Sequence, residues 1–214
     1  MGGEEQAAAY ARADFEEPHS RFITLLGERL PGLPKTGHAL DLGCGSGDIS
    51  LRFARSPAHP GWQVDGVDGS AAMLAWARRD AAEVGLEGRA RFVEAFLPTE
   101  DLPREGYDLV FSNSLLHHLG DPLVLWQSVQ RWGGAGAAVF VMDLLRPESP
   151  EQARELVETH ASGEPEVLRT DFYNSLLAAY RLDEVEQQLA QGGLESLRVE
   201  AVSDRHFIAW GHLG

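Results

Sequence analysis

The stretch that decides the fold is Ala39-Leu-Asp-Leu-Gly-Cys-Gly-Ser-Gly-Asp48. A short apolar run contains an acid near its end, and three glycines then follow at every second position. Because glycine has no Cβ, its backbone bends freely and a ligand can approach it closely. The amide groups at the start of the next helix stay free to donate hydrogen bonds. The stretch therefore predicts a strand, a tight ligand-binding turn and a helix.

A second acid supports this interpretation. Asp68 ends another short apolar run, about 25 residues beyond Gly43. A carboxylate at that place can accept hydrogen bonds from both hydroxyl groups of a ribose. Together the turn and Asp68 predict a nucleoside site.

Apolar runs and helical patterns alternate along the middle of the chain. We expect strands, most of them covered on both faces, over residues 38–42, 62–67, 90–94, 107–112 and 137–144. Ser70 is a good N-cap for a helix that ends at Gly85, and Pro122 suits the first turn of another. The buried face of the first helix is expected to hold Met73, Ala77, Ala81 and Val84. This alternation predicts an α/β fold with a doubly wound, mostly parallel sheet between two helical layers.

Both ends of the chain depart from the alternation. Residues 1–36 read as a helical lead-in, with Phe22, Leu25, Leu26 and Leu30 at helical spacing. Helical patterns are also expected over residues 150–160, 171–180 and 182–191, followed by strand-like runs over 194–202 and 205–210. The short link between these runs predicts a C-terminal antiparallel hairpin. Residues 146–181 exceed what one α/β unit needs. We expect an insertion there, either a substrate lid or a helical pair that does not contact substrate, within a single domain spanning 1–214.

Composition limits the class of partner. The 214 residues carry a net charge of −15, and such a field repels nucleic acid and anionic lipid, although solubility alone also explains it. Cys44 is the single cysteine, so no internal disulfide can form and a small packed residue is a better interpretation than a nucleophile. With no secretion signal expected at the N-terminus, we predict a cytoplasmic protein.

Three details distinguish between candidate nucleosides. The glycines follow G-x-G-x-G, whereas dinucleotide sites use G-x-G-x-x-G. Asp41 lies two residues before the first glycine, where a carboxylate suits a ligand ammonium better than a pyrophosphate. The fourth strand runs into Phe111-Ser-Asn-Ser-Leu-Leu-His-His-Leu119.

With these motifs the chain resembles the class I S-adenosylmethionine-dependent methyltransferases of the small-molecule type, over residues 37–145. The resemblance implies a Rossmann-like three-layer fold and S-adenosyl-L-methionine as the cofactor. It also implies methyl transfer to a small-molecule acceptor by in-line displacement. No metal-ligand spacing is present in the sequence, and no metal is expected.

The resemblance also assigns site residues. Asp41 corresponds to the acid near the cofactor ammonium, Asp68 to the acid on the ribose, and Ser112 and Asn113 to the segment behind the sulfonium. Glu94-Ala95-Phe96 stands where relatives carry an aspartate for the adenine amine, a departure in both the acid and its spacing. The full predicted cofactor set is Asp41, Gly43, Gly45, Gly47, Asp68, Gly69, Met73, Glu94, Ala95, Phe96, Ser112 and Asn113.

Acceptor contacts are less defined by the sequence. The substrate candidates are Tyr10, His19, Arg21, His118, Tyr173 and Asn174. Proton transfer by His117 or His118 is open, because histidine also serves as a packed or capping residue, and no catalytic residue is assigned.

Other functions on the same scaffold stay open. These are a nicotinamide oxidoreductase, an enzyme that uses the cofactor without methyl transfer, a non-catalytic sensor or, more weakly, an RNA methyltransferase. The acceptor, its reacting atom and the oligomeric state do not follow from the sequence.

Overall fold

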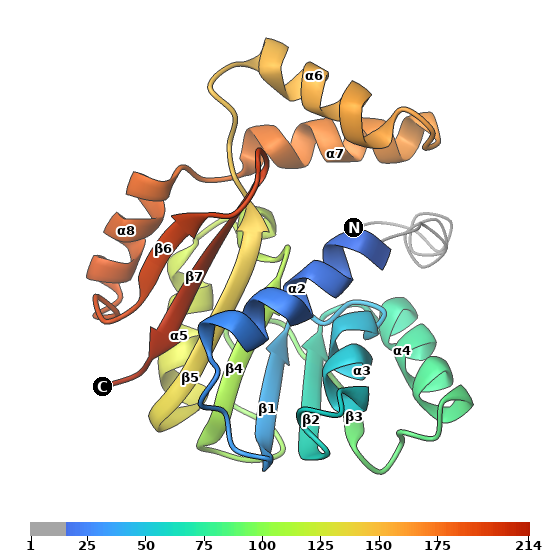
Figure 1. Cartoon of the computed structure of the whole chain (residues 1–214), viewed down its shortest axis with the longest axis vertical. Coiled ribbons are helices and arrows are strands. Elements are labelled where there is room, and N and C mark those ends of the chain that lie inside the picture. Colours follow the sequence, from blue (N-terminus) through green and yellow to red (C-terminus); the bar gives the residue numbers. More distant parts are fainter. Residues whose placement is uncertain (1–15) are drawn as a thin grey trace.

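A seven-stranded sheet forms the centre of the molecule (Figure 1). The computed structural model describes residues 16–214. Its strands, in the spatial order β3-β2-β1-β4-β5-β7-β6, are β1 (Thr36–Leu42), β2 (Gly61–Asp68), β3 (Ala90–Glu94), β4 (Tyr107–Asn113), β5 (Gly133–Leu144), β6 (Arg198–Ala201) and β7 (His206–His212). The first five strands pair in parallel, whereas β7 is antiparallel to both β5 and β6. The predicted doubly wound α/β fold with a C-terminal hairpin is confirmed.

Helices cover both faces of this sheet (Figure 1). They are α2 (Glu16–Arg29), α3 (Asp48–Arg55), α4 (Ala71–Glu83), α5 (Leu123–Trp132), α6 (Pro150–Ala161), α7 (Glu166–Ala178), α8 (Leu182–Gln191) and a 3-10 turn, η1 (Leu116–His118). Apolar residues of α2, α3 and α4 pack on one face; those of α5 and α8 pack on the other. On the first face, Phe22 of α2 meets Phe140 of β5 edge to face, with ring centroids 5.0 Å apart. The core therefore lies in two layers separated by the sheet.

The helix after β2 begins and ends where the sequence predicts. Ser70 Oγ accepts a hydrogen bond from the Met73 amide at 3.3 Å. Gly85, the residue after the C-cap, has a φ of 70° and ends the helix. The predicted buried face is wrong for Val84, which is 45% exposed. Val84 is the C-cap, so the chain already turns away from the sheet at this residue.

The C-terminal third differs in its boundaries. The hairpin is confirmed, and the Val202 amide donates to the His206 carbonyl at 2.9 Å. β6 is shorter than the predicted run because the Leu194 amide bonds the Leu189 carbonyl and completes the end of α8 instead. The second inserted helix begins at Glu166, five residues before the predicted start, and Tyr180 bridges Leu145 rather than continuing the helix.

The inserted helices α6 and α7 stand beyond the carboxyl end of β5 (Figure 1). They share a small core in which Leu156, Val157 and Leu176 pack with Leu144 of β5. This core attaches the pair to the sheet edge at which the parallel strands end. No helix within residues 16–214 is long and apolar enough to cross a membrane.

Candidate functional site

The glycine turn lies where the winding of the sheet reverses. β1 pairs with β2 on one side and β4 on the other, and ligands of such sheets bind beyond the carboxyl ends of these strands. The amides of Gly43 and Cys44 both donate to the Val67 carbonyl, at 2.8 and 3.0 Å. The turn is thereby held over the end of β2.

Each of the three glycines has a positive φ: 74° at Gly43, 53° at Gly45 and 79° at Gly47. A Cβ on Gly43 would lie 2.8 Å from the Leu115 side chain, and one on Gly47 would lie 2.8 Å from Ala77 and Phe92. At Gly45 the nearest atom is the Met73 methyl, at 3.4 Å. Packing within the protein therefore requires Gly43 and Gly47, while Gly45 leaves backbone open to a ligand.

Asp68 is fixed beside this open backbone. Its Oδ2 accepts the Gly45 amide at 2.9 Å, and its Oδ1 accepts the Ser70 amide at 2.8 Å. An ionised carboxylate has about four lone-pair positions, so two protein donors leave room for two more. Asp68 is thus oriented by the turn and can still bind hydroxyl groups.

Asp41 lies beneath the same turn and is 2% exposed. Ser50 Oγ donates to its Oδ2 at 2.5 Å. Burial raises the pKa of Asp41 to about 7, the Ser50 hydrogen bond opposes this rise, and the charge of Asp68 adds to it. A cation above the turn would favour the ionised form.

An aromatic surface lies on the other side of Asp68. The Phe96 ring is 77% exposed and rests on the backbone of Gly69, where a Cβ would come within 2.6 Å of it. The Ala95 amide donates to the Asp68 carbonyl at 3.1 Å, and the side chain of Glu94 is exposed. A flat ring left in solvent beside a carboxylate suits a stacked base next to a ribose.

β4 ends close to the first glycine. Ser112 is buried and its hydroxyl donates to the Leu42 carbonyl at 2.7 Å; Asn113 is half-buried at the end of the strand. Ser114 then adopts a φ of 54°, and Leu115 packs on Gly43. The segment after β4 is therefore packed directly against the glycine turn.

A buried histidine–carboxylate pair follows. His117 Nδ1 lies 2.5 Å from Asp143 Oδ1, with the two side chains 3% and 2% exposed. The His118 ring lies 4.0 Å from the His117 ring and is exposed. Sequence analysis did not single out Asp143, although an acid at the end of the apolar run 137–144 is the same signal that identifies Asp68.

The predicted acceptor residues that the structure describes lie on three elements, α2, η1 and α7. Tyr10 lies outside the described residues. His19 Nδ1 bonds Asp48 at 2.6 Å and so joins α2 to α3. On α7, Tyr173 is half-buried with the Arg154 guanidinium of α6 5.6 Å from its ring centroid, while Asn174 is exposed.

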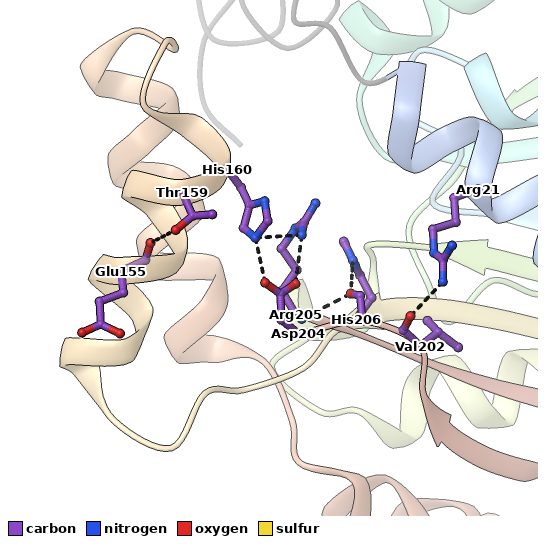
Figure 2. Close-up of polar contacts among 9 residues, drawn as sticks. Arg21, Glu155, Thr159, His160, Val202, Asp204, Arg205 and His206 are labelled. Carbon is purple, nitrogen blue, oxygen red and sulfur yellow. Dashed lines mark hydrogen bonds and ion pairs between the residues drawn. The ribbon is translucent and has the colours of Figure 1, made fainter.

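Helices α2 and α6 both contact the β6–β7 turn (Figure 2). From α6, His160 Nε2 lies 2.8 Å from Asp204 and 2.9 Å from Arg205. From α2, the Arg21 guanidinium donates to the Val202 carbonyl at 2.8 Å. The turn thus connects the helical lead-in to the inserted helices.

A separate cavity of about 320 Å³ lies at the amino ends of β2 and β3, lined among others by Gln63, Asp65, Arg89 and Arg91. It is therefore remote from the carboxyl ends that carry the glycine turn. In the part of the chain that the structure describes, no group of three or more His, Cys, Asp or Glu residues is placed to hold a metal ion.

The fold and this site define a nucleoside-binding α/β protein. Residues 39–136 match the family model described as a methyltransferase domain. This match, together with the similarity to named methyltransferases, supports a class I S-adenosylmethionine-dependent methyltransferase.

Three relatives illustrate the similarity. The chain is 38% identical to a ribosomal RNA small subunit methyltransferase C of Alcanivorax borkumensis, over 40% of this chain and 24% of that one. It is 27% identical to the 27-O-demethylrifamycin SV methyltransferase of Amycolatopsis mediterranei, over 92% of this chain and 68% of that one. A crystal structure of a SAM-dependent methyltransferase from Aquifex aeolicus superposes with a TM-score of 0.72 at 18% identity, covering 100% of both chains. The first of these matches thus spans a minor part of a longer protein.

Proposed function

We propose that this protein transfers a methyl group from S-adenosylmethionine to a small-molecule acceptor. The observation that carries the proposal is the position of Asp68, bonded to the Gly45 amide and flanked by the exposed Phe96 ring. A ribose carboxylate, an open glycine backbone and a stacking surface fit the three parts of an adenosyl group.

Each group of predicted residues would contact a different part of the cofactor. Asp68 would accept the ribose hydroxyls, and Gly69, Met73 and Phe96 would contact the adenine, with Glu94 and Ala95 at its edge. Asp41 would balance the amino group from beneath the turn formed by Gly43, Gly45 and Gly47. Ser112 and Asn113 would back the sulfonium end. This assignment fits the buried Asp41, because a ligand cation above the turn would lower its raised pKa.

S-adenosylmethionine supplies the methyl group on an activated sulfonium. The chain therefore has to align an acceptor and exclude water. Holding two reactants in line can lower a barrier by about 7–11 kcal/mol. The pair α6–α7, attached beyond β5 and held to the β6–β7 turn, is suited to cover the acceptor.

A small acceptor fits better than RNA. The net charge of −15 opposes the approach of a phosphate backbone. The rifamycin enzyme, whose name states a small-molecule substrate, aligns over 92% of this chain, whereas the ribosomal RNA enzyme aligns over 40%. A reducing, cytoplasmic location stays a prediction from the single Cys44.

The test is calorimetric titration with S-adenosylmethionine, S-adenosylhomocysteine and NADH. We expect micromolar binding of both sulfur nucleosides, and binding weakened about 10- to 100-fold in Asp68→Asn, because hydrogen bonds to a charged group contribute about 1.5–3 kcal/mol. Asp65→Asn is the matched control. It lies on the same strand, accepts the Tyr107 hydroxyl at 2.7 Å and is remote from the turn.

The outcomes separate the alternatives. NADH binding without the sulfur nucleosides would overturn the proposal in favour of an oxidoreductase. Tight cofactor binding without methylated product from any acceptor would indicate a sensor.

A further inference from the structure

We propose that His117 is the general base of the reaction and that the acceptor reacts through a neutral hydroxyl group, with Asp143 as the positioning residue. The inference rests on the proposed function and extends it to an acceptor class. The evidence is the geometry at the ends of β4 and β5.

Asp143 arranges the histidine through three hydrogen bonds. Its Oδ2 accepts the Leu116 amide at 2.7 Å; its Oδ1 accepts the Leu144 amide at 2.7 Å and lies 2.5 Å from His117 Nδ1. The carboxylate thereby holds both the backbone of η1 and the imidazole ring, and a buried ring bonded in this way has one orientation.

This contact also selects the tautomer. An ionised carboxylate only accepts hydrogen bonds, so Nδ1 carries a proton, and in the neutral ring Nε2 then keeps its lone pair. Nε2 makes no hydrogen bond to residues 16–214. In the neutral ring, Nε2 of His117 is therefore a proton acceptor that no described protein group occupies.

The His117 ring lies in η1, just beyond the carboxyl end of β4, at the same end of the sheet as the glycine turn. Leu115, two residues before His117, packs on Gly43 of the glycine turn. Ser112 and Asn113, assigned above to the sulfonium end, complete the same strand. A group bound between the turn and α7 would meet His117 at the position where a methyl acceptor is required.

The chemistry favours a hydroxyl acceptor. Three carboxyl groups, those of Asp41, Asp68 and Asp143, lie along this edge and disfavour an acceptor that arrives as an anion. A neutral hydroxyl must lose its proton as its oxygen bonds the methyl carbon. The O–H proton then passes to Nε2 of His117, and the electron pair of the breaking carbon–sulfur bond stays on sulfur. An amine attacks with a free lone pair and has less need of a fixed base.

The first experiment determines the tautomer without any acceptor. In protein labelled with ¹⁵N-histidine and saturated with S-adenosylhomocysteine, we expect the neutral His117 ring to carry its proton on Nδ1. The signal is assigned by its loss in His117→Gln and its retention in His118→Gln. Asp143→Asn should move the proton to Nε2, because an amide can donate to Nδ1. A proton on Nε2 in the wild type would overturn the inference, whether or not an acceptor is known.

The second experiment measures turnover. Phenol, 4-nitrophenol, a primary alcohol, a primary amine and a thiol are each incubated with S-adenosylmethionine, and methylated products are detected by mass. We expect O-methylation that falls 10²- to 10⁴-fold in His117→Gln, with a smaller loss for 4-nitrophenol because this acceptor ionises more readily. The affinity of this variant for S-adenosylhomocysteine should be unchanged. His212→Gln, an exposed histidine at the far end of β7 from the glycine turn, should retain activity. Equal rates in His117→Gln and wild type, or products from the amine or thiol alone, would contradict the inference, whereas failure of cofactor binding would contradict the proposed function instead.

Discussion

At the scale of single residues, the carboxyl group of Asp41 couples stability to pH. Its pKa is raised to about 7 in the folded protein, from 3.8 when unperturbed, chiefly by burial. Between these values the folded state binds more protons than the unfolded state, so this contribution is full below about pH 4 and is lost as pH rises through 7.

We therefore expect Asp41→Asn to gain stability relative to wild type as pH rises from 4 to 8. The difference should change by up to about 1.4 kcal/mol per pH unit. Urea unfolding of both cofactor-free proteins across this range measures it. Parallel stability curves would show that Asp41 ionises normally.

The glycine turn allows backbone strain and crowding to be separated. Gly47 and Gly85 both have a positive φ, but a Cβ on Gly47 would strike Ala77 and Phe92, whereas nothing lies within 4 Å of one on Gly85. Gly85→Ala should cost about 1–2 kcal/mol from backbone strain alone. Gly47→Ala should cost about 1–3 kcal/mol more. Chemical denaturation measures both, and equal losses would contradict the crowding argument.

Sequence analysis predicted those parts of the candidate site that have a local sequence signal. The glycines and Asp68 carry their signal in short runs, since each ends a strand or forms a turn. The His117–Asp143 pair was not found because the two residues are 26 positions apart and meet only through the pairing of β4 with β5. No local pattern contains that contact. The assignment of each residue to a part of the cofactor stays a prediction.

At the scale of elements, the sheet was more predictable than the insertion. The bounds of β3 match the expected 90–94, where buried Ala90 and Phe92 alternate with exposed Arg91, as in a strand with one covered face. α7 begins earlier than expected because Pro165 and Glu166 start a helix on the solvent side, where apolar periodicity is weak. Val84 was misplaced because periodicity does not show where a helix leaves the sheet.

The contact between α6 and the β6–β7 turn contributes to the stability of α6, and this contribution can be measured. The Asp204 side chain pairs with His160 and Arg205 and is 51% exposed, so the contact stabilises α6 by at most about 1 kcal/mol. Asp204→Asn should speed amide exchange in α6 up to about five-fold without global unfolding. The matched control is Glu155→Gln, which removes an equal charge from the exposed middle of α6. Hydrogen exchange followed by mass spectrometry compares them, and equal effects would exclude the turn contact.

At the scale of the whole molecule, the charge predicts which polymers are excluded. With a net charge of −15, the protein should not bind a short ribosomal RNA hairpin at low salt under conditions that saturate it with S-adenosylhomocysteine. Fluorescence anisotropy of labelled RNA measures this. Tight, salt-sensitive binding would favour the RNA methyltransferase alternative over a small acceptor.

The order of strands at the C-terminal side also affects how the chain is synthesised. β7 lies between β5 and β6, yet β6 leaves the ribosome first. Until β7 emerges, β5 exposes a free edge containing Val139, Val141 and other residues that are buried in the finished fold. A nascent chain paused between residues 198 and 206 would therefore carry an open, aggregation-prone strand, and completing β7 closes that edge.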